Sequence, residues 1–320
     1  MTGKPRVSVL LPAYNAEPYV RAAIESVLGQ TYRDWEIIAT DDRSVDGTAA
    51  VLEDYARRDP RIRAFRNASN AGMTGNWNLC LERASGDLVL KLDADDALRP
   101  QTLEILAAAL EAEDVTGAGV RTLVCDAMLE PRDVLPADDA MRRAGLDPQL
   151  DHLLENRNWY VIAAHGHQLW HSCAVMFRRD FLQRTGGWDE RFGCASDTEI
   201  IWRLLEGPGR FAHSGYEGVL YRILEGSVSD TFRKNDWLRW EGTAANLMTL
   251  GRVRKRRTLP WGLRSWHADL YDSWCRSLDE NRRALPPAFF DKIRSAVAES
   301  PPPPHLDRLL WRLRTWIPIR

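Results

Sequence analysis

The segment Asp93-Ala94-Asp95-Asp96 concentrates carboxylates directly after an apolar run over residues 88–92. A buried strand that ends in clustered acids presents hard oxygen ligands at a sheet edge, and a divalent cation relieves the repulsion between them. In open α/β sheets, ligands bind outside the carboxyl ends of the strands, and these acids fall at such an end. The segment therefore indicates a metal-assisted site. The alternative is an acidic turn that caps a helix starting near Pro100, because Asp favours turns and helix N-termini.

Alternating strands and helices are expected to position these acids. The expected strands cover residues 7–11, 35–40, 61–65 and 88–92, and the expected helices cover residues 20–28, 48–58 and 76–84. Pro12 is expected to stop the first strand. This alternation predicts an α/β fold with a mainly parallel sheet, right-handed crossovers and flanking helices. A second acidic pair, Asp41 and Asp42, then ends another strand of the same sheet.

A set of short fragments recurs in order through roughly the first hundred residues. These are Val-Ser-Val-Leu-Leu-Pro-Ala-Tyr-Asn at 7–15, Gln-Thr-Tyr at 30–32, Asp-Asp-Arg-Ser-Val-Asp-Gly-Thr at 41–48, Asn-Ala-Gly at 70–72 and the acids of 93–96. Together they resemble the family 2 inverting glycosyltransferases. The resemblance implies a Rossmann-like GT-A fold, a nucleotide-sugar donor and non-processive transfer. A processive synthase would add membrane spans and a Gln-x-x-Arg-Trp signature, and neither appears in the sequence.

The resemblance also assigns roles in donor binding. It implies that Asp95 is the direct ligand of Mg²⁺ or Mn²⁺, which would neutralise charge on the departing nucleoside diphosphate. Asp93 would lie beside the ribose and the metal-bound waters. Asp42 would accept a hydrogen bond from the nucleobase, which fits uridine best without excluding thymidine or guanosine. The other residues of the expected donor pocket are Pro12, Tyr14, Asn15, Asn70 and Gly72.

A looser resemblance continues in the acceptor half. Residues 172–179 and 186–190 look like the acceptor-side strand and the turn that follows it. Asp197 matches the catalytic base, which must take the proton from the attacking hydroxyl; the alternative is that it only caps the following helix. Ser196 stands where the family usually has Glu. Leu224 stands where the family often has a His near the donor diphosphate, so that contact is absent or comes from elsewhere.

Length and charge bound the remaining possibilities. The chain of 320 residues is expected to form a nucleotide-sugar-binding half at 1–100, an acceptor-binding half at 101–230 and a helical C-terminal extension at 231–320. A formal net charge of −2 argues against a polyanion binder, hence against nucleic acid as a partner. The five Cys residues show no paired metal-ligand spacing, as in reduced cytoplasmic proteins. No segment is apolar and long enough for a signal core or a membrane span.

Two groups in the second half are open to more than one interpretation. His165, His167 and His171 could hold zinc, but the sequence shows no Cys or acid nearby to complete a set. Trp159 and Trp170 could form a wall of the acceptor pocket, because aromatic faces stack on sugars, or they could pack in the core. The Pro-rich and acidic segment 126–158 is expected to contain an insertion or a mobile loop over the active site.

The C-terminal tail has its own sequence character. Residues 305–320 read as a basic, aromatic, amphipathic helix that either touches the inner face of a membrane or docks on protein, including a second copy. The expected acceptor is a glycan or a lipid-linked glycan.

Two other functions compete with the glycosyltransferase interpretation. One is an inactive scaffold protein with this fold. The other is a nucleotidyltransferase, which would need a Gly-rich phosphate loop that residues 12–15 do not provide.

Overall fold

The computed structural model describes residues 6–134, 137–163, 169–235 and 237–255, together with the single positions 291 and 295. The chain divides into two units. The first runs to Asp189 and includes Gly207–Ser227, and the second comprises Glu190–Glu206 and the residues from Val228 onward. The domain boundaries expected from the sequence at residues 100 and 230 stay predictions.

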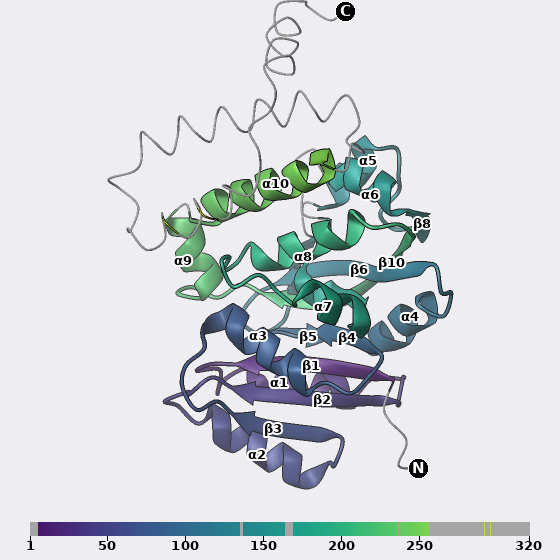
Figure 1. Ribbon diagram of the computed structural model, residues 1–320. Coiled ribbons are helices and arrows are strands. Elements are labelled where there is room, and N and C mark those ends of the chain that lie inside the picture. The colour runs from purple at the N-terminus through teal and green to yellow at the C-terminus, as the bar shows by residue number, and fades with distance from the viewer. Residues whose placement is uncertain are drawn as a thin grey trace, which may run out of the picture. The chain divides into compact units, whose positions relative to one another are not determined.

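The first unit is built on one mixed sheet of ten strands (Figure 1). The strands are β1 (Val7–Ala13), β2 (Trp35–Asp41), β3 (Ile62–Arg66), β4 (Leu88–Lys91), β5 (Ala97–Leu98), β6 (Val115–Cys125), β7 (Pro131–Val134), β8 (His152–Glu155), β9 (Val175–Arg178) and β10 (Arg210–Arg222). Their order is β3-β2-β1-β4-β9-β6-β10-β5, with β7 beside β6 and β8 beside β10. β3, β2, β1 and β4 are parallel, whereas β9 is antiparallel to both β4 and β6. The predicted mainly parallel α/β sheet is therefore confirmed.

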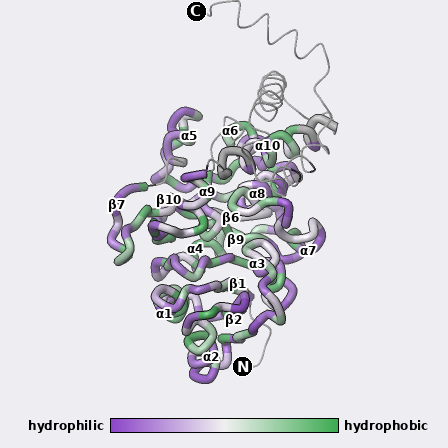
Figure 2. The backbone as a smooth tube through the Cα atoms, turned by 90° about the vertical axis from the view of Figure 1, so that its left-hand side faces the viewer, coloured by the Kyte–Doolittle hydropathy of each residue, from purple (hydrophilic) through white to green (hydrophobic). Residues whose placement is uncertain are grey.

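Helices flank this sheet and also form the second unit. The first unit contains α1 (Val20–Leu28), α2 (Thr48–Arg58), α3 (Gly72–Arg83), α4 (Thr102–Ala109), α5 (Ala137–Arg143), α6 (Asn156–Ala163), α7 (Arg179–Thr185) and the 3₁₀ turn η1 (Ser172–Ala174). The second contains α8 (Ser196–Leu205), α9 (Val228–Lys234) and α10 (Trp237–Lys255). β1 and β2 are buried along their whole length, as expected of parallel strands covered on both faces. In Figure 2 the tube is coloured hydrophobic around β6 and β9 and hydrophilic over α5.

Among the elements predicted from the sequence, β1 and α3 differ from the prediction by two residues or more. β1 continues through Pro12 to Ala13, because β4 pairs with β1 only as far as Leu10 and no neighbour needs the N–H that proline lacks. α3 begins at Gly72 and not near residue 76. The preceding backbone is already fixed, since the Ala71 N–H donates to Asp42 Oδ1 at 2.8 Å.

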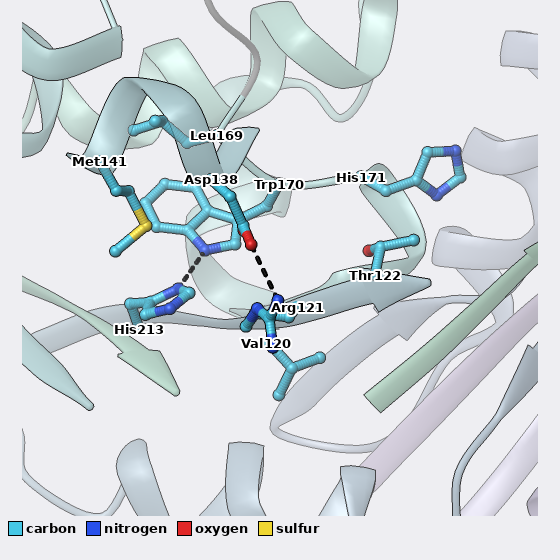
Figure 3. A pocket seen from close by; sticks show the side chains of 9 residues that line it. All are labelled: Val120, Arg121, Thr122, Asp138, Met141, Leu169, Trp170, His171 and His213. Carbon is cyan, nitrogen blue, oxygen red and sulfur yellow. Dashed lines mark hydrogen bonds and ion pairs between the residues drawn. The ribbon is translucent and has the colours of Figure 1, made fainter. Parts of the chain in front are cut away.

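The segment 126–158, which was expected to contain an insertion or a mobile loop, has regular elements among its described residues, and the insertion stays a prediction. It contains β7, α5 and β8, and β8 pairs antiparallel with the first part of β10. Trp159 and Trp170 follow, with exposures of 0% and 2%, and their rings contact each other at 5.1 Å between centroids. The Trp170 indole N–H donates to His213 Nδ1 at 3.0 Å (Figure 3). Interpreting these indoles as an acceptor-pocket wall is therefore wrong, because both rings pack in the core.

The helical prediction for the C-terminal extension is met by α9 and α10 up to residue 255. Residues 305–320, for which membrane contact and protein docking were both open, lie outside the described residues. Among the helices of the described ranges, none combines the length and the apolar character needed to cross a bilayer.

Candidate active site

The acid cluster, defined as Asp93, Asp95 and Asp96, begins one residue after the end of β4, with Leu92 between Lys91 and Asp93. β1 lies on one side of β4 and β9 on the other, so the cluster falls at the carboxyl edge of the parallel strands. The acids do not cap the next helix. β5 intervenes, and the N-cap residue of α4 is Gln101. The helix-capping alternative is therefore wrong, and the cluster occupies the place where α/β sheets bind ligands.

Asp93 is held from two directions. Lys91 Nζ lies 2.5 Å from Asp93 Oδ1, and the Cys173 thiol donates to Oδ2 at 3.2 Å. Lys91 itself is only 1% exposed, and its ammonium group lies 4.0 Å from the centre of the Trp77 ring. Burial disfavours ionisation of Asp93, but the charge of Lys91, the neighbouring His171 and the hydrogen bonds from Lys91 and Cys173 together outweigh it and lower the pKa of that carboxyl below its usual range. Asp93 is therefore an ionised carboxylate in a fixed orientation.

The other two acids of the cluster lack such a counter-charge. Burial, followed by the charge of Asp93, raises the pKa of Asp95 to about 6. Burial and the charges of Asp95 and Asp93 raise the pKa of Asp96 well above its usual range. Asp96 accepts the Arg222 backbone N–H at 2.9 Å, while Arg222 Nε donates to the Asp95 carbonyl at 2.7 Å. This unrelieved repulsion among carboxylates fits a divalent cation with oxygen ligands, such as Mg²⁺ or Mn²⁺.

Two further side chains, His171 and Cys173, reach the acid cluster from the side of β4 on which β9 lies. Ligand atoms of Asp96, His171 and Cys173 all lie within 4.8 Å of one another. The expectation that no Cys or acid stands near His171 is therefore wrong, because the antiparallel pairing of β9 with β4 places η1 at the acid cluster. Burial lowers the pKa of His171 to about 4 and raises that of Cys173 well above its usual range, so both groups are neutral. His165 and His167 lie outside the described residues.

Asp42 forms a second polar centre, just after β2. It is 2% exposed, and its Oδ1 accepts both the Asn67 side-chain amide at 2.7 Å and the Ala71 N–H at 2.8 Å. Asn70 donates to the Asp42 carbonyl at 3.1 Å and accepts the Gly72 N–H at 3.0 Å. The carboxylate is thereby oriented by amide donors, a geometry suited to recognising a further hydrogen-bond donor.

The loop after β1 lies against this centre. Asn15 has a left-handed backbone (φ 48°), its N–H donates to Ser44 Oγ, and its Oδ1 accepts the Val45 N–H, both at 2.9 Å. Tyr14 beside it is 53% exposed, whereas Pro12 is buried in β1. The structure therefore brings Asn15, Asp42, Asn70 and Gly72 to one edge of the sheet, with Tyr14 exposed next to them.

Three residues of this edge were missed by sequence reasoning: Lys91, Cys173 and Arg222. Lys91 carries a signal that could have been used, because a lysine inside an apolar strand needs a counter-charge, and Asp93 follows it by two positions. Cys173 and Arg222 carry no such signal in the sequence. They reach the acids only through the pairing of β9 with β4 and through the hydrogen bonds of the end of β10.

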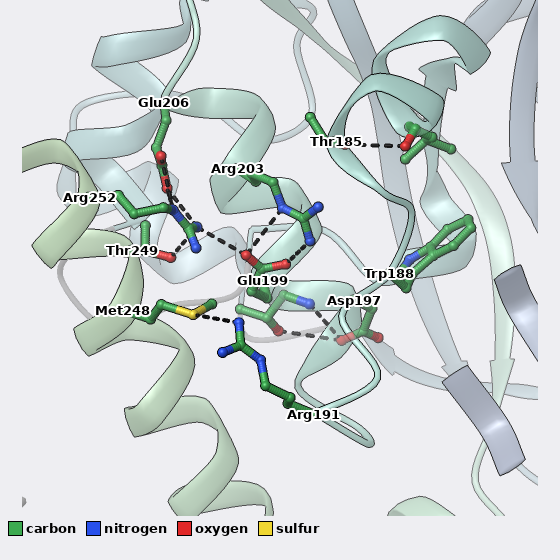
Figure 4. Close-up of polar contacts among 12 residues, drawn as sticks. Thr185, Trp188, Arg191, Asp197, Glu199, Arg203, Glu206, Met248, Thr249 and Arg252 are labelled. Atoms are coloured by element: carbon green, nitrogen blue, oxygen red, sulfur yellow. Dashed lines mark hydrogen bonds and ion pairs between the residues drawn. The ribbon is translucent and has the colours of Figure 1, made fainter. Parts of the chain in front are cut away.

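The second unit contains the expected base. α8 begins at Ser196 after the N-cap residue Ala195, so Asp197 is in the first turn and is not the cap. Asp197 Oδ1 accepts the Thr198 N–H at 2.7 Å and the side chain is partly exposed. The other acid of this turn, Glu199, is 1% exposed and bonds to Arg203 and to Arg252, the latter at 3.0 Å (Figure 4). Asp197 is thus the partly exposed acid of this turn, whereas Glu199 is buried and held by two arginines.

Curated relatives resemble the first part of the chain. EpsE of Bacillus subtilis (strain 168) is 38% identical over 124 residues, which are 38% of this chain and 45% of that protein. UDP-Glc:alpha-D-GlcNAc-diphosphoundecaprenol beta-1,3-glucosyltransferase WfgD of Escherichia coli is 39% identical over 99 residues, or 31% of this chain and 38% of WfgD. The matched part spans less than half the length of either relative.

Solved structures share the fold. S. aureus TarS 1-349 in complex with UDP-GlcNAc superposes with a TM-score of 0.58 at 16% identity, covering 92% of this chain and 90% of that one. Mannosyltransferase PcManGT from Pyrobaculum calidifontis, in complex with GDP-Man and Mn²⁺, superposes with a TM-score of 0.53 at 16% identity, covering 98% and 85%. At this level of identity the likeness confirms the predicted GT-A fold.

The family model described as glycosyl transferase family 2 matches residues 8–184. This match includes β1 to β4, the acid cluster, His171 and Cys173. The chain therefore belongs to glycosyl transferase family 2.

Proposed function

We propose that this protein is an inverting glycosyltransferase that moves one sugar from a nucleoside-diphosphate donor, preferably a UDP-sugar, to a hydroxyl of a glycan or lipid-linked glycan. The observation that carries the proposal is the acid cluster at the carboxyl end of β4, where the pKa of Asp95 is raised to about 6 beside an ionised Asp93. Family membership supports it, and so do TarS and PcManGT, which share the fold and bind nucleotide sugars.

Asp95 would hold Mg²⁺ or Mn²⁺, with Asp93 beside it. A cation bound there supplies Lewis-acid stabilisation of the charge that develops on the leaving diphosphate. Lys91 and Cys173 keep Asp93 in one orientation, and Arg222 fixes the backbone of Asp95 and the carboxylate of Asp96. Asp42 would accept the imide N–H of uracil while Asn67 and Ala71 hold its other oxygen.

The proposed transfer needs one base. The bond between the anomeric carbon and the diphosphate oxygen breaks, and its electron pair stays on that oxygen. The acceptor oxygen forms the new bond from the opposite face, which inverts the anomeric centre, and its proton goes to Asp197.

Asp197→Asn is expected to abolish transfer and to leave donor affinity within about twofold, because it removes the base and not the donor site. Loss of donor binding in that variant would move the base to another residue.

Calorimetric titration with UDP, dTDP and GDP, each with and without Mn²⁺, tests the donor site. Tight binding of one nucleotide that requires both Mn²⁺ and Asp95 is the expected result, and Asp95→Asn should lower the affinity at least about 100-fold because it removes the direct ligand. Binding of none of them would overturn the proposal. Donor binding without turnover on any acceptor would instead favour the scaffold alternative, which the departures at Ser196 and Leu224 leave open.

The acceptor class rests on the relatives. The name of WfgD specifies a diphosphoundecaprenol-linked acceptor, and an acceptor of that kind would bring the present protein to a membrane surface. Peripheral membrane contact at the cytoplasmic face is therefore part of the proposal. Self-association stays a separate prediction, which does not depend on the acceptor. Transfer assayed on lipid-linked and on free oligosaccharide acceptors tests this part, because transfer to the free acceptor alone would contradict the lipid-linked class.

A further inference from the structure

His171 is the residue of the acid-cluster region whose hydrogen-bonding capacity the proposed reaction has not used. It lies at the N-terminus of η1, which leads into β9. Because β9 runs antiparallel to β4, with Met176 opposite Leu90, the turn before β9 must lie where β4 ends. The imidazole is thus brought to the acid cluster by strand pairing.

Two contacts fix the position of this imidazole. Its Nδ1 accepts the Cys173 backbone N–H at 3.4 Å, and its face packs on the Tyr221 ring with 4.3 Å between centroids. Tyr221 immediately precedes Arg222, which binds Asp95 and Asp96. In Figure 3 the His171 ring lies apart from the hydrogen-bonded pair of Trp170 and His213. His171 therefore belongs to the acid cluster and not to the aromatic core.

The hydrogen bond at Nδ1 decides which ring nitrogen carries the proton. A neutral imidazole that accepts at Nδ1 has its proton on Nε2, so this side chain offers an N–H donor. Within the described ranges, the only hydrogen bond of the ring is the one at Nδ1. Asp93 and Asp96 already have donors, because Lys91 binds Asp93, the Arg222 N–H binds Asp96, and the one thiol proton of Cys173 is within reach of either carboxylate. The Nε2–H is thus left for an anionic oxygen of a ligand.

The geometry points to His171 as a catalytic residue that donates its Nε2–H to the β-phosphate of the nucleoside-diphosphate donor. This inference rests on the proposed function, since it takes the donor diphosphate to lie at the acid cluster. No proton is transferred to the phosphate, and the imidazole stays neutral throughout. The hydrogen bond strengthens as the anomeric bond breaks, because the negative charge on the β-phosphate grows at that step.

Three variants separate the role of His171 as a hydrogen-bond donor from its packing on Tyr221. His171→Phe keeps a ring to pack on Tyr221 and removes the N–H, whereas His171→Gln removes the ring and keeps an N–H at a similar reach. His152→Phe is the matched control, because His152 pairs with the opposite end of β10. The probes are UDP and UMP, each titrated calorimetrically with Mn²⁺, since UMP lacks the β-phosphate.

The expected result is a loss of about 10- to 100-fold in UDP affinity for His171→Phe, the range for hydrogen bonds to charged groups. UMP affinity should stay within about twofold, His171→Gln should recover most of the UDP affinity, and His152→Phe should bind both probes as the unaltered protein does. Equal losses for UDP and UMP, or no loss for UDP, would overturn this inference alone. Failure of the unaltered protein to bind UDP, dTDP or GDP would overturn the proposed function itself.

A spectroscopic measurement excludes the other way in which an imidazole could act. Electron spin echo measurements on the Mn²⁺–UDP complex, with the protein labelled with ¹⁵N-histidine, detect a ring nitrogen bound to the metal. We expect no directly bound nitrogen, because Nδ1 is already an acceptor and Nε2 carries the proton. Coupling of a directly bound nitrogen that disappears in His171→Gln would overturn the hydrogen-bond role and make His171 a metal ligand.

Discussion

At the end of β2, neighbouring residues supply a guanidinium group and N–H donors to the buried carboxylates of Asp41 and Asp42. Asp41 pairs with Arg66 at 3.0 Å, and Asp42 accepts two hydrogen bonds. At the end of β4, three carboxylates lie together, and of these only Asp93 has a close ammonium partner among the described residues. Burial, followed by the charges of the other acids in the cluster, raises the pKa of Asp95 to about 6 and that of Asp96 well above its usual value.

The two strand ends therefore suit different ligands. A carboxylate whose orientation is fixed by amides can discriminate between hydrogen-bond donors, such as the edges of nucleobases. A cluster with unrelieved negative charge gains most from a cation. Under the proposed function, the same residue type at the same edge of one sheet would serve two purposes, because the surrounding donors differ. Perturbing each end should therefore affect nucleobase recognition and cation binding separately.

The largest effect is expected from removing the ammonium group of the acid cluster. Lys91→Met keeps the packing on Trp77 but leaves Asp93 without its counter-charge, which should lower the free energy of unfolding by about 3 kcal/mol in the absence of cation. Mn²⁺ should restore much of this loss, because it supplies positive charge to the same carboxylates. Urea unfolding with and without Mn²⁺ measures both. The double variant Lys91→Met/Asp93→Asn should be more stable than Lys91→Met alone, and an equal loss in both would contradict the ion-pair explanation.

A smaller and more selective effect is expected at the end of β2. In Asp42→Asn, the amide oxygen can still accept from Asn67 and Ala71, but the amide N–H₂ would face the imide N–H of uracil. UDP affinity should fall by about 10- to 100-fold, while the factor by which Mn²⁺ improves binding should stay unchanged. Calorimetry with UDP, with and without Mn²⁺, checks both numbers. A lost Mn²⁺ dependence would show that the two strand ends do not act separately.

Acid should weaken cation binding by a known amount. With a pKa of about 6, Asp95 becomes protonated as the pH falls below that value, so Mn²⁺ affinity should drop by about tenfold between pH 7 and pH 5. The raised pKa of Asp95 also affects the free energy of unfolding, and here a lower pH is favourable. Without cation, the folded protein binds the Asp95 proton more tightly than the unfolded chain does, so this contribution to the free energy of unfolding falls as the pH rises from about 4 to about 6.

Asp95→Asn isolates this contribution. At pH 7 without cation, the variant should melt at a higher temperature than the unaltered protein, because the unfavourable charge is gone. The difference between the two should shrink as the pH is lowered toward 4. Calorimetric melting curves across this range measure it, and a variant that is less stable at pH 7 would show that Asp95 is not strained by its neighbours.

The smallest effect is expected for Arg66. Asp41 is buried, but its partner Arg66 is 49% exposed, so solvent screens the pair. Arg66→Gln should lower the free energy of unfolding by about 1 kcal/mol and leave the Mn²⁺ dependence of UDP binding unchanged. Arg57→Gln, which removes an exposed pair with Asp54, serves as the control and should cost less. A large loss of cation binding in Arg66→Gln would link the two strand ends.

The first four strands and the helices between them could be predicted because each follows from local pattern. β-branched runs and helical spacing place them to within a few residues, and the acids at their ends mark the binding edge. The second half could not be read in this way. The segment 126–158 was expected to contain an insertion or a mobile loop, because its Pro and acidic content hides β7, α5 and β8. Of these elements, β8 is stabilised by pairing with the distant β10. Trp159 and Trp170 resembled sugar-binding aromatics, but tertiary packing buries them.

By itself, the sequence determined the family, the parallel α/β core and the positions of Asp42 and the acid cluster, because strand ends and acidic turns are local features. Only the tertiary structure decided which side chains surround those acids. Cys173 and His171 lie at least 77 and 75 residues from the acids in sequence and reach them through the antiparallel pairing of β9 with β4. Strand pairing between distant segments carries no local signal, since the hydrogen bonds that fix it come from the backbone, which is the same for every residue type.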